Sequence, residues 1–280
     1  MLDNPLPPCH GEPVVDLSSL LADLRAEGDE LDSWLADLPE PTWRTPTPAP
    51  GWTVAHQVAH LAWTDERALL ATTDAAAFQA EIVEALKSDP DPQRFVDQGA
   101  EDGARRSPRD LLHHWRERRT ALHDALAATP DGVKLPWYGP PMSPASMATA
   151  RLMETWAHSN DVADALEIRK PTTDRIRHVA HLGVRTRDFA YLVRQKPVPT
   201  APFRVELTSP SGALWTWGPD DATARVTGPA LDFCLLVTQR VHRADTALEA
   251  TGEAEEWLGI AQAFAGPPGD GRPRQEGKAR

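Results

Sequence analysis

The apolar positions in the first part of the chain recur at helical spacing. Leucines recur three and four residues apart through residues 16–38, which is typical of one buried face of an amphipathic helix. A second pattern of this kind begins after Thr53, a residue type that favours the N-cap position, and continues to about Thr72. The intervening run 41–52 contains four prolines, so we expect a loop there.

Further helices are predicted up to residue 194. A short one covers residues 75–87 and is followed by a polar stretch to Arg106, in which no helix is predicted. Ser107-Pro108 and Ser143-Pro144 each combine an N-cap residue with a proline suited to the first helical turn. The helices that they open are expected to end near residues 128 and 168, and another helix is expected over residues 173–194.

The period of the pattern changes after Lys196-Pro197, where apolar and polar residues begin to alternate as they do in strands. The expected strands cover residues 203–208, 213–217 and 223–227, and the expected helices after them cover residues 229–241 and 253–265. The pattern predicts an α+β protein, in which a helical bundle of residues 16–195 precedes a small α+β domain of residues 196–266. Residues 1–15 are expected to be a flexible N-terminus and residues 267–280 a disordered tail.

Composition narrows the functional classes. The net charge of −12 disfavours binding to phosphate backbones, so we expect no nucleic-acid partner. No apolar run approaches 18 residues and no signal peptide is recognised, so we expect a cytoplasmic protein without a membrane partner.

The two cysteines make no disulfide framework or Cys-x-x-Cys pattern, and Cys234 is expected to be a core residue. Seven of the ten tryptophans fall in the first 160 residues, either as helix-packing residues or as the wall of a pocket.

Two histidines of the second helix are the first candidates for chemistry. His56 and His60 are four residues apart, so their imidazoles project from one helical face. A zinc protease helix carries a glutamate directly after the first histidine, where it acts as the general base. Gln57 occupies that position, which argues against a protease.

The helix predicted from Ser143 carries a second set of polar residues. Glu154 and His158 share a face, and Asp161 follows one turn later. Facing helices of a bundle can direct such residues at one ion, so His60, Glu154 and His158 form a candidate metal site with open coordination positions. A surface pair between Glu154 and His158 is the alternative that spacing alone leaves open. Neighbouring apolar residues such as Leu152 and Trp156 favour the buried site.

Three segments together resemble the DinB-like, mycothiol-dependent maleylpyruvate isomerase family. PAPGWTVAHQVAHLAWTD is similar to the N-terminal motif of that family, and ARLMETWAHSNDVADAL is similar to its second metal motif. VTGPALDFCLLVTQR and LEATGEAEEWL resemble its small, sterol-carrier-like C-terminal domain. The similarity is strongest to an actinobacterial subgroup of metal-binding members.

This resemblance implies a DinB-like four-helix bundle in which His60, Glu154 and His158 bind a divalent metal ion. Zinc is the expected ion, with nickel, cobalt, manganese and iron as alternatives. Family members use a low-molecular-weight thiol, mainly mycothiol, for S-transfer or isomerisation, and the ion would lower the pKa of that thiol. Arg240 is at about the right position to hold a carboxylate substrate, with Arg243 close behind.

Several roles stay open at this point. His56 could be a fourth ligand, a group supporting the ligands or a plain helix residue, and we favour the last two. Asp161 is expected to support the ligands through hydrogen bonding. The leading hypothesis is a metal-dependent thiol transferase or isomerase. The alternatives are a hydrolase or lyase that activates water, and a non-enzymatic small-molecule binding protein stapled by its metal. The expected partners are a small-molecule substrate and a thiol, and a homodimer is left open.

Overall fold

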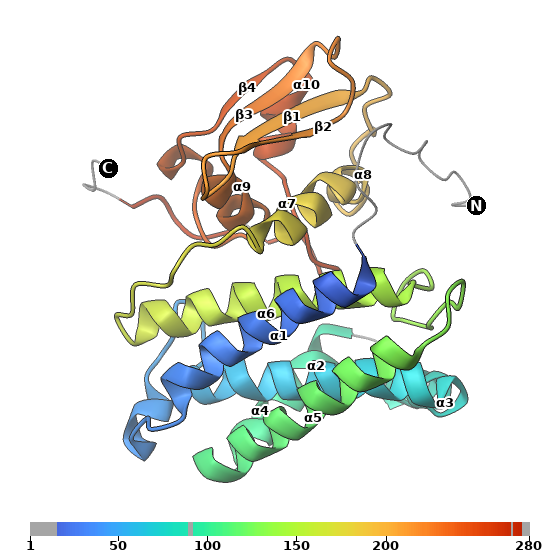
Figure 1. Cartoon of the computed structure of the whole chain (residues 1–280), viewed down its shortest axis with the longest axis vertical. Helices are drawn as coiled ribbons and strands as arrows, with labels where there is room; N and C mark the ends of the chain where they lie inside the picture. Colours follow the sequence, from blue (N-terminus) through green and yellow to red (C-terminus); the bar gives the residue numbers. More distant parts are fainter. Residues whose placement is uncertain (1–15, 89–91, 270, 276–280) are drawn as a thin grey trace. The chain divides into compact units, whose positions relative to one another are not determined.

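The computed structural model describes residues 16–88, 92–269 and 271–275, so the expectation for residues 1–15 lies outside the described residues. The chain divides into two compact units, which are described separately (Figure 1). One unit comprises Leu17–Leu182 together with Phe264–Pro267. The other comprises Gly183–Ala263 together with the residues from Pro268 onward.

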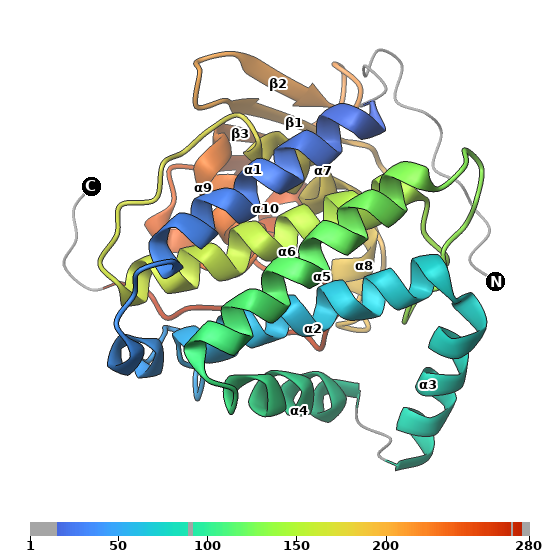
Figure 2. The ribbon, with the colours of Figure 1, turned by 60° about the horizontal axis from the view of Figure 1, so that its bottom comes forward.

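Four long helices form the core of the first unit, as the apolar pattern predicts. They are α1 (Leu17–Leu35), α2 (Val54–Thr73), α5 (Pro108–Ala128) and α6 (Pro144–Ala165). Helix α2 packs against both α5 and α6, and α1 packs against α5 and α6 (Figure 2). The centre is apolar: the fully buried residues there include Leu31, Leu35, Val58, Leu61 and Leu111. Burial of each such side chain contributes about 1.5–3 kcal/mol relative to exposure.

Local signals begin these helices where the sequence predicts. The Ser107 hydroxyl accepts the amide N–H of Asp110 at 3.2 Å, and the Ser143 hydroxyl accepts that of Ser146 at 3.1 Å. Each serine is followed by proline, whose missing N–H costs nothing in the first turn. These caps set where α5 and α6 begin and therefore which residues of α6 face α2.

Two shorter helices flank α2. Helix α3 (Ala75–Ser88) agrees with the prediction, whereas α4 (Pro92–Ala104) occupies the polar stretch in which no helix was predicted. That prediction was wrong because α4 packs through small residues instead of a wide apolar stripe. A Cβ atom on Gly103 would lie 2.8 Å from Cβ of Ala59, and one on Gly99 would lie 2.6 Å from the Trp63 ring. The two glycines let α4 lie close against α2.

The second unit contains a four-stranded sheet in the order β2-β1-β3-β4. Its strands are β1 (Phe203–Thr208), β2 (Leu214–Trp217), β3 (Ala224–Pro229) and β4 (Glu249–Thr251). Strand β1 pairs antiparallel with β2 and parallel with β3, so that Val205 lies opposite both Trp217 and Val226. The alternate residues Phe203, Val205 and Leu207 are buried, which confirms the predicted alternation.

Helices α9 (Ala230–Val237) and α10 (Glu253–Leu258) pack on this sheet, and Cys234 of α9 is fully buried as predicted. Both helices are shorter than the predicted 229–241 and 253–265. Gln239 takes a φ of 60°, a left-handed conformation in which a helix cannot continue. The 3₁₀ segments η1 and η2 lie at Glu40–Arg44 and Arg243–Asp245.

Two other details differ from the prediction. The expected helix 173–194 consists of α7 (Ile176–Arg185) and α8 (Arg187–Leu192), separated at Thr186. Strand β4 is too short to give an alternating pattern and was not predicted. In the predicted disordered tail, the carbonyl oxygen of Gly269 accepts a hydrogen bond from Arg194, and the amide of Gln275 donates to Asp245. Residues 270 and 276–280 of that tail lie outside the described part.

Candidate metal centre

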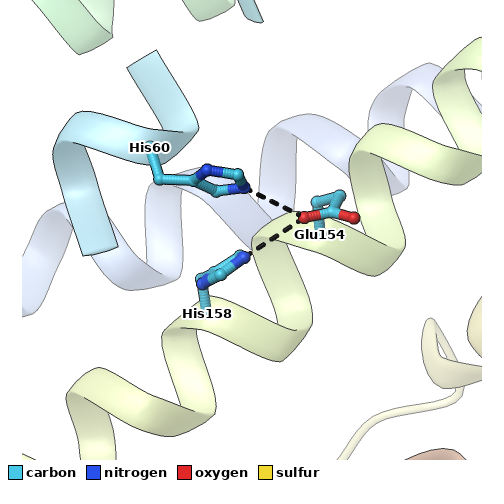
Figure 3. A group of neighbouring side chains, drawn as sticks. All are labelled: His60, Glu154 and His158. Carbon is cyan, nitrogen blue, oxygen red and sulfur yellow. Dashed lines mark hydrogen bonds and ion pairs between the residues drawn. The ribbon is translucent and has the colours of Figure 1, made fainter. Parts of the chain in front are cut away.

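Three predicted ligands meet between α2 and α6. Nε2 of His60 lies 3.3 Å from Oε2 of Glu154, and Nε2 of His158 lies 3.2 Å from the same oxygen (Figure 3). The three ligand atoms lie within 4.8 Å of one another, and these residues form the group that could hold a metal ion within the described part of the chain. The surface-pair alternative does not describe this arrangement, because the side chains of His60 and His158 are only 9% and 12% exposed.

The spacing of the three atoms suits a small divalent ion. Zinc binds imidazole nitrogen and carboxylate oxygen at about 2.0–2.1 Å, and a tetrahedral angle then separates two ligand atoms by about 3.3 Å. The observed separations from Oε2 of Glu154 are 3.3 and 3.2 Å. Two imidazoles and one carboxylate also leave a position for a further ligand on the ion. The side chain of Glu154 is 22% exposed, so the group is not completely shielded from solvent.

Gln57 fixes the ring of His158, a role that sequence reasoning missed. Its amide nitrogen donates to Oγ1 of Thr47 at 2.8 Å, which directs its carbonyl Oε1 toward Nδ1 of His158 at 2.5 Å. Nδ1 of His158 therefore donates to this amide oxygen, and Nε2 is the nitrogen that faces the Glu154 carboxylate. An amide oxygen behind a histidine ligand is a common way to set its tautomer.

The protonation states favour metal binding near neutral pH. Burial and, to a smaller extent, the neighbouring His158 lower the pKa of His60 to about 4, although Glu154 opposes the shift. Burial alone would raise the pKa of Glu154, but hydrogen bonds from His158 and His60 outweigh it and hold that pKa well below its ordinary value. A neutral imidazole and an ionised carboxylate are the forms that bind metals. Nδ1 of His60 is buried without a hydrogen-bond partner among the described residues.

Asp161 lies near the site, but the side chain of Gln57 is closer to Nδ1 of His158. Oδ2 of Asp161 is 4.0 Å from Nδ1 of His158, whereas Oε1 of Gln57 is 2.5 Å from the same atom. The carboxyl group of Asp161 is almost completely buried. Gln57 is the direct partner of His158, and a supporting role for Asp161 stays a prediction.

His56 stabilises the beginning of α2 instead of joining the three candidate ligands. Its Nδ1 accepts the amide N–H of Thr53 at 3.3 Å and lies 2.8 Å from the Thr53 hydroxyl, which forms a capping box at the beginning of α2. Nε2 then carries the proton and donates to Glu101 of α4 at 2.9 Å. Both nitrogens of His56 are therefore engaged away from Glu154, so a ligand role is disfavoured.

Trp52 forms a wall beside both histidine ligands. Its ring centroid lies 5.3 Å from that of His60 and 5.9 Å from that of His158, and it is stacked on the latter. An indole at this position limits the directions in which the imidazoles can turn and in which water can approach. For Trp52, the pocket-wall interpretation of the tryptophans fits better than a purely packing role.

The two arginines expected to bind substrate belong to the C-terminal unit. Nη1 of Arg240 donates to the carbonyl oxygen of Thr238 at 2.6 Å. Arg243 contacts Oγ1 of Thr246 at 3.2 Å and the carboxylate of Glu255 at 3.6 Å. These contacts order both side chains locally, and their role toward a substrate stays a prediction.

Among the described residues, no helix is long and apolar enough to cross a membrane.

The helical bundle with two histidines and a glutamate from facing helices defines the class to which this chain belongs: DinB-like proteins with a small C-terminal α+β domain. The mycothiol maleylpyruvate isomerase N-terminal domain matches residues 24–163, and the chain belongs to that family. A second model, described as wyosine base formation, matches residues 199–251.

The chain is also similar to two mycobacterial proteins in sequence and to two solved structures in fold. Two Mycobacterium tuberculosis proteins, MT0041 of strain CDC 1551 / Oshkosh and Rv0036c of strain ATCC 25618 / H37Rv, are each 57% identical over 260 residues. The alignment covers 92% of this chain and 100% of each relative. The crystal structure of the mycothiol-dependent maleylpyruvate isomerase matches with a TM-score of 0.56 and 14% identity, covering 84% of this chain and 93% of that one. A histidine-to-alanine mutant of that protein matches with a TM-score of 0.54, 14% identity and coverage of 81% and 90%. At this identity the likeness concerns the fold.

Proposed function

We propose that this protein is a metal-dependent enzyme that uses a low-molecular-weight thiol, mycothiol or a close analogue, for S-transfer or isomerisation of a small electrophile. The observation that carries the proposal is the meeting of Nε2 of His60, Nε2 of His158 and Oε2 of Glu154 at ligand spacing. Membership of a family named for mycothiol supports the thiol. Zinc is the proposed ion because its preferred ligands and distances suit this set.

The side chains divide the work in this proposal. His60, His158 and Glu154 would hold the ion, whose chemistry is to lower the pKa of a bound thiol. Gln57 holds His158 with Nε2 toward Glu154, and Trp52 shields one side of the imidazoles from water. In an S-transfer, the thiol sulfur forms a bond to the electrophilic carbon, the leaving group departs with its electron pair, and the thiol proton passes to solvent.

A thiol-consumption assay tests this proposal. Zinc-loaded protein is mixed with mycothiol and monobromobimane, so that the S–C bond formed and the bromide released are both measurable. Wild type should consume thiol at least about tenfold faster than His60→Ala, in the range that activation of a nucleophile provides. His113→Ala is the matched control, because His113 is an exposed histidine of α5 that pairs with Glu117, and it should behave as wild type.

Two results would contradict the proposal. Equal thiol consumption by wild type and His60→Ala would remove the enzymatic role of the site. If zinc then still raised the melting temperature of wild type strongly, a non-enzymatic binding protein stabilised by its metal would be the better explanation. Hydrolysis of an ester that needs zinc but no thiol would favour the hydrolase alternative.

A further inference from the structure

A buried ion pair joins α2 to α6 one turn away from the candidate metal ligands. Nε of Arg151 donates to Oδ1 of Asp65 at 2.9 Å. Asp65 follows His60 by five residues on α2, and Arg151 precedes Glu154 by three residues on α6. The two side chains are 6% and 3% exposed, so the pair is almost completely removed from water.

The pair is connected to the backbone of a candidate ligand through one hydroxyl group. Nη2 of Arg151 donates to Oγ1 of Thr64 at 2.6 Å, and Oγ1 of Thr64 donates to the carbonyl oxygen of His60 at 2.8 Å. On α6, the carbonyl oxygen of Arg151 accepts the hydroxyl of Thr155, the residue next to Glu154. A continuous set of hydrogen bonds therefore runs from the backbone of His60 to the turn of α6 that carries Glu154.

Stability alone does not account for such a pair. Moving two charges out of water costs several kcal/mol per ion, and apolar residues of similar volume are often neutral or stabilising in their place. Burial raises the pKa of the Asp65 carboxyl, and the Arg151 guanidinium opposes that rise. An ion pair is directional, whereas apolar packing is not. The donor and acceptor atoms of the pair define one register between the helices.

Such a register is what the candidate site needs. His60 comes from α2, whereas Glu154 and His158 come from α6, so a shift of either helix along its axis changes the separation of the ligand atoms. Metal sites tolerate displacements of about 0.5 Å before geometry is lost. Apolar contacts alone define this register less sharply, because the hydrophobic effect is not directional.

We propose that Asp65 and Arg151 are positioning residues that set the register of α2 against α6 and so hold His60 at ligand distance from Glu154 and His158. This inference rests on the proposed metal site and adds to it a pair that contacts neither the ion nor the substrate. The pair acts through Thr64 on one helix and through the backbone next to Thr155 on the other.

The test compares metal affinity with stability in the full-length chain, with Co²⁺ as the probe. The main variant is Asp65→Leu/Arg151→Met, which replaces both charges with apolar groups of similar size. It is expected to unfold at or above the melting temperature of wild type in the metal-free form. Its Co²⁺ affinity should fall about tenfold or more, as when groups that orient metal ligands are removed. The visible absorption bands of bound Co²⁺ should also change in position or intensity, which a purely structural role would not cause.

Two further variants complete the comparison. Arg151→Lys keeps the positive charge but not both donor positions, so it should restore part of the Co²⁺ affinity. Lys170→Met is the matched control, because Lys170 belongs to a buried ion pair with Glu27 elsewhere in the same unit. It should lower the melting temperature and leave the Co²⁺ affinity and spectrum unchanged. Thr64→Val, which removes the hydroxyl between Arg151 and the carbonyl oxygen of His60, replaces the double variant if the latter does not fold, and its Co²⁺ affinity should also fall.

The outcomes separate this inference from the proposed function. Wild-type Co²⁺ affinity and spectrum in the Asp65 and Arg151 variants, with metal bound by wild type, would overturn the positioning role and leave the metal site intact. Failure of wild type itself to bind Co²⁺ would overturn the proposed metal-dependent function, and the positioning role with it.

Discussion

Two glutamates of the helical bundle each lie between two nitrogen-bearing side chains, and the type of those side chains differs. The side chain of Glu27 is 2% exposed and lies between Lys170 at 2.6 Å and Arg175 at 3.0 Å. Glu154 lies between two imidazoles at 3.3 and 3.2 Å. The first carboxylate is neutralised by permanent cations, and its group is complete. The second faces rings with lone pairs available, which can share a metal ion with it.

This difference separates a structural cluster from a chemical one. Lysine and arginine have no lone pair to offer at neutral pH, so the Glu27 cluster can only tie α1 to the segment that follows α6. Neutral histidines are metal ligands, and the pKa directions of His60 and Glu154 keep both in their ligand forms. Burial of a carboxylate alone therefore indicates neither role, and the type of its partners decides between them.

The largest effect is expected when the Glu27 cluster is broken. Glu27→Ala leaves Lys170 and Arg175 buried with Glu30 as their remaining shared carboxylate among the described residues, and it should lower the free energy of unfolding by about 3–5 kcal/mol. Urea unfolding measures this change, and zinc content should stay at the wild-type level when the protein is folded. A Glu27→Ala protein that loses its zinc would show that the two clusters are not independent.

A pH titration tests the cluster around Glu154, which contains His60. The pKa of His60 is about 4 in the folded chain and about 6.5 when unfolded, so between these values the unfolded chain holds a proton that the folded chain lacks. The free energy of unfolding of metal-free protein should therefore fall by up to about 3 kcal/mol as the pH drops from 6.5 to 4. The pKa of Glu154, held well below its ordinary value, adds to the loss below about pH 4.5.

His60→Asn is the control for this pH dependence, because it removes the group that titrates between pH 4 and 6.5. Urea unfolding at several pH values should give a flatter profile for this variant than for wild type. The same slope in both proteins would show that the pH dependence comes from another group.

A smaller effect is expected from Gln57→Leu, which removes the acceptor behind His158. Zinc affinity should fall about 10- to 100-fold, corresponding to about 1.4–2.8 kcal/mol, because the ring loses its fixed tautomer. Gln57→Glu keeps an acceptor and should retain tight binding. Competition with a chromophoric chelator measures both affinities, and unchanged binding in Gln57→Leu would contradict the role given to this amide.

The sequence predicts the candidate ligands better than their supporting groups. His60, Glu154 and His158 could be selected because helical spacing places Glu154 and His158 on one face and because family motifs surround all three. Gln57 could not be selected as the partner of His158, because that contact depends on the register between α2 and α6. Gln57 entered sequence reasoning only as the wrong residue for a protease.

The same limit applies to the fold. The long helices of the bundle have wide apolar faces and were predicted with their capping serines Ser107 and Ser143. Helix α4 was missed because glycine and alanine mediate its close approach to α2, which is a tertiary property. Likewise, the parallel pairing of β1 with β3 joins strands separated by β2 and leaves no local signal.

The central claim is that His60, Glu154 and His158 bind one metal ion, and direct metal analysis tests it best. Wild type, Glu154→Ala and Glu117→Ala are purified, loaded with zinc, dialysed and measured by inductively coupled plasma mass spectrometry. Glu117 is half-exposed on α5 and serves as the matched control. The account predicts one zinc per chain in wild type and in Glu117→Ala, and almost none in Glu154→Ala. Equal zinc content in wild type and Glu154→Ala, whether high or negligible, would contradict it.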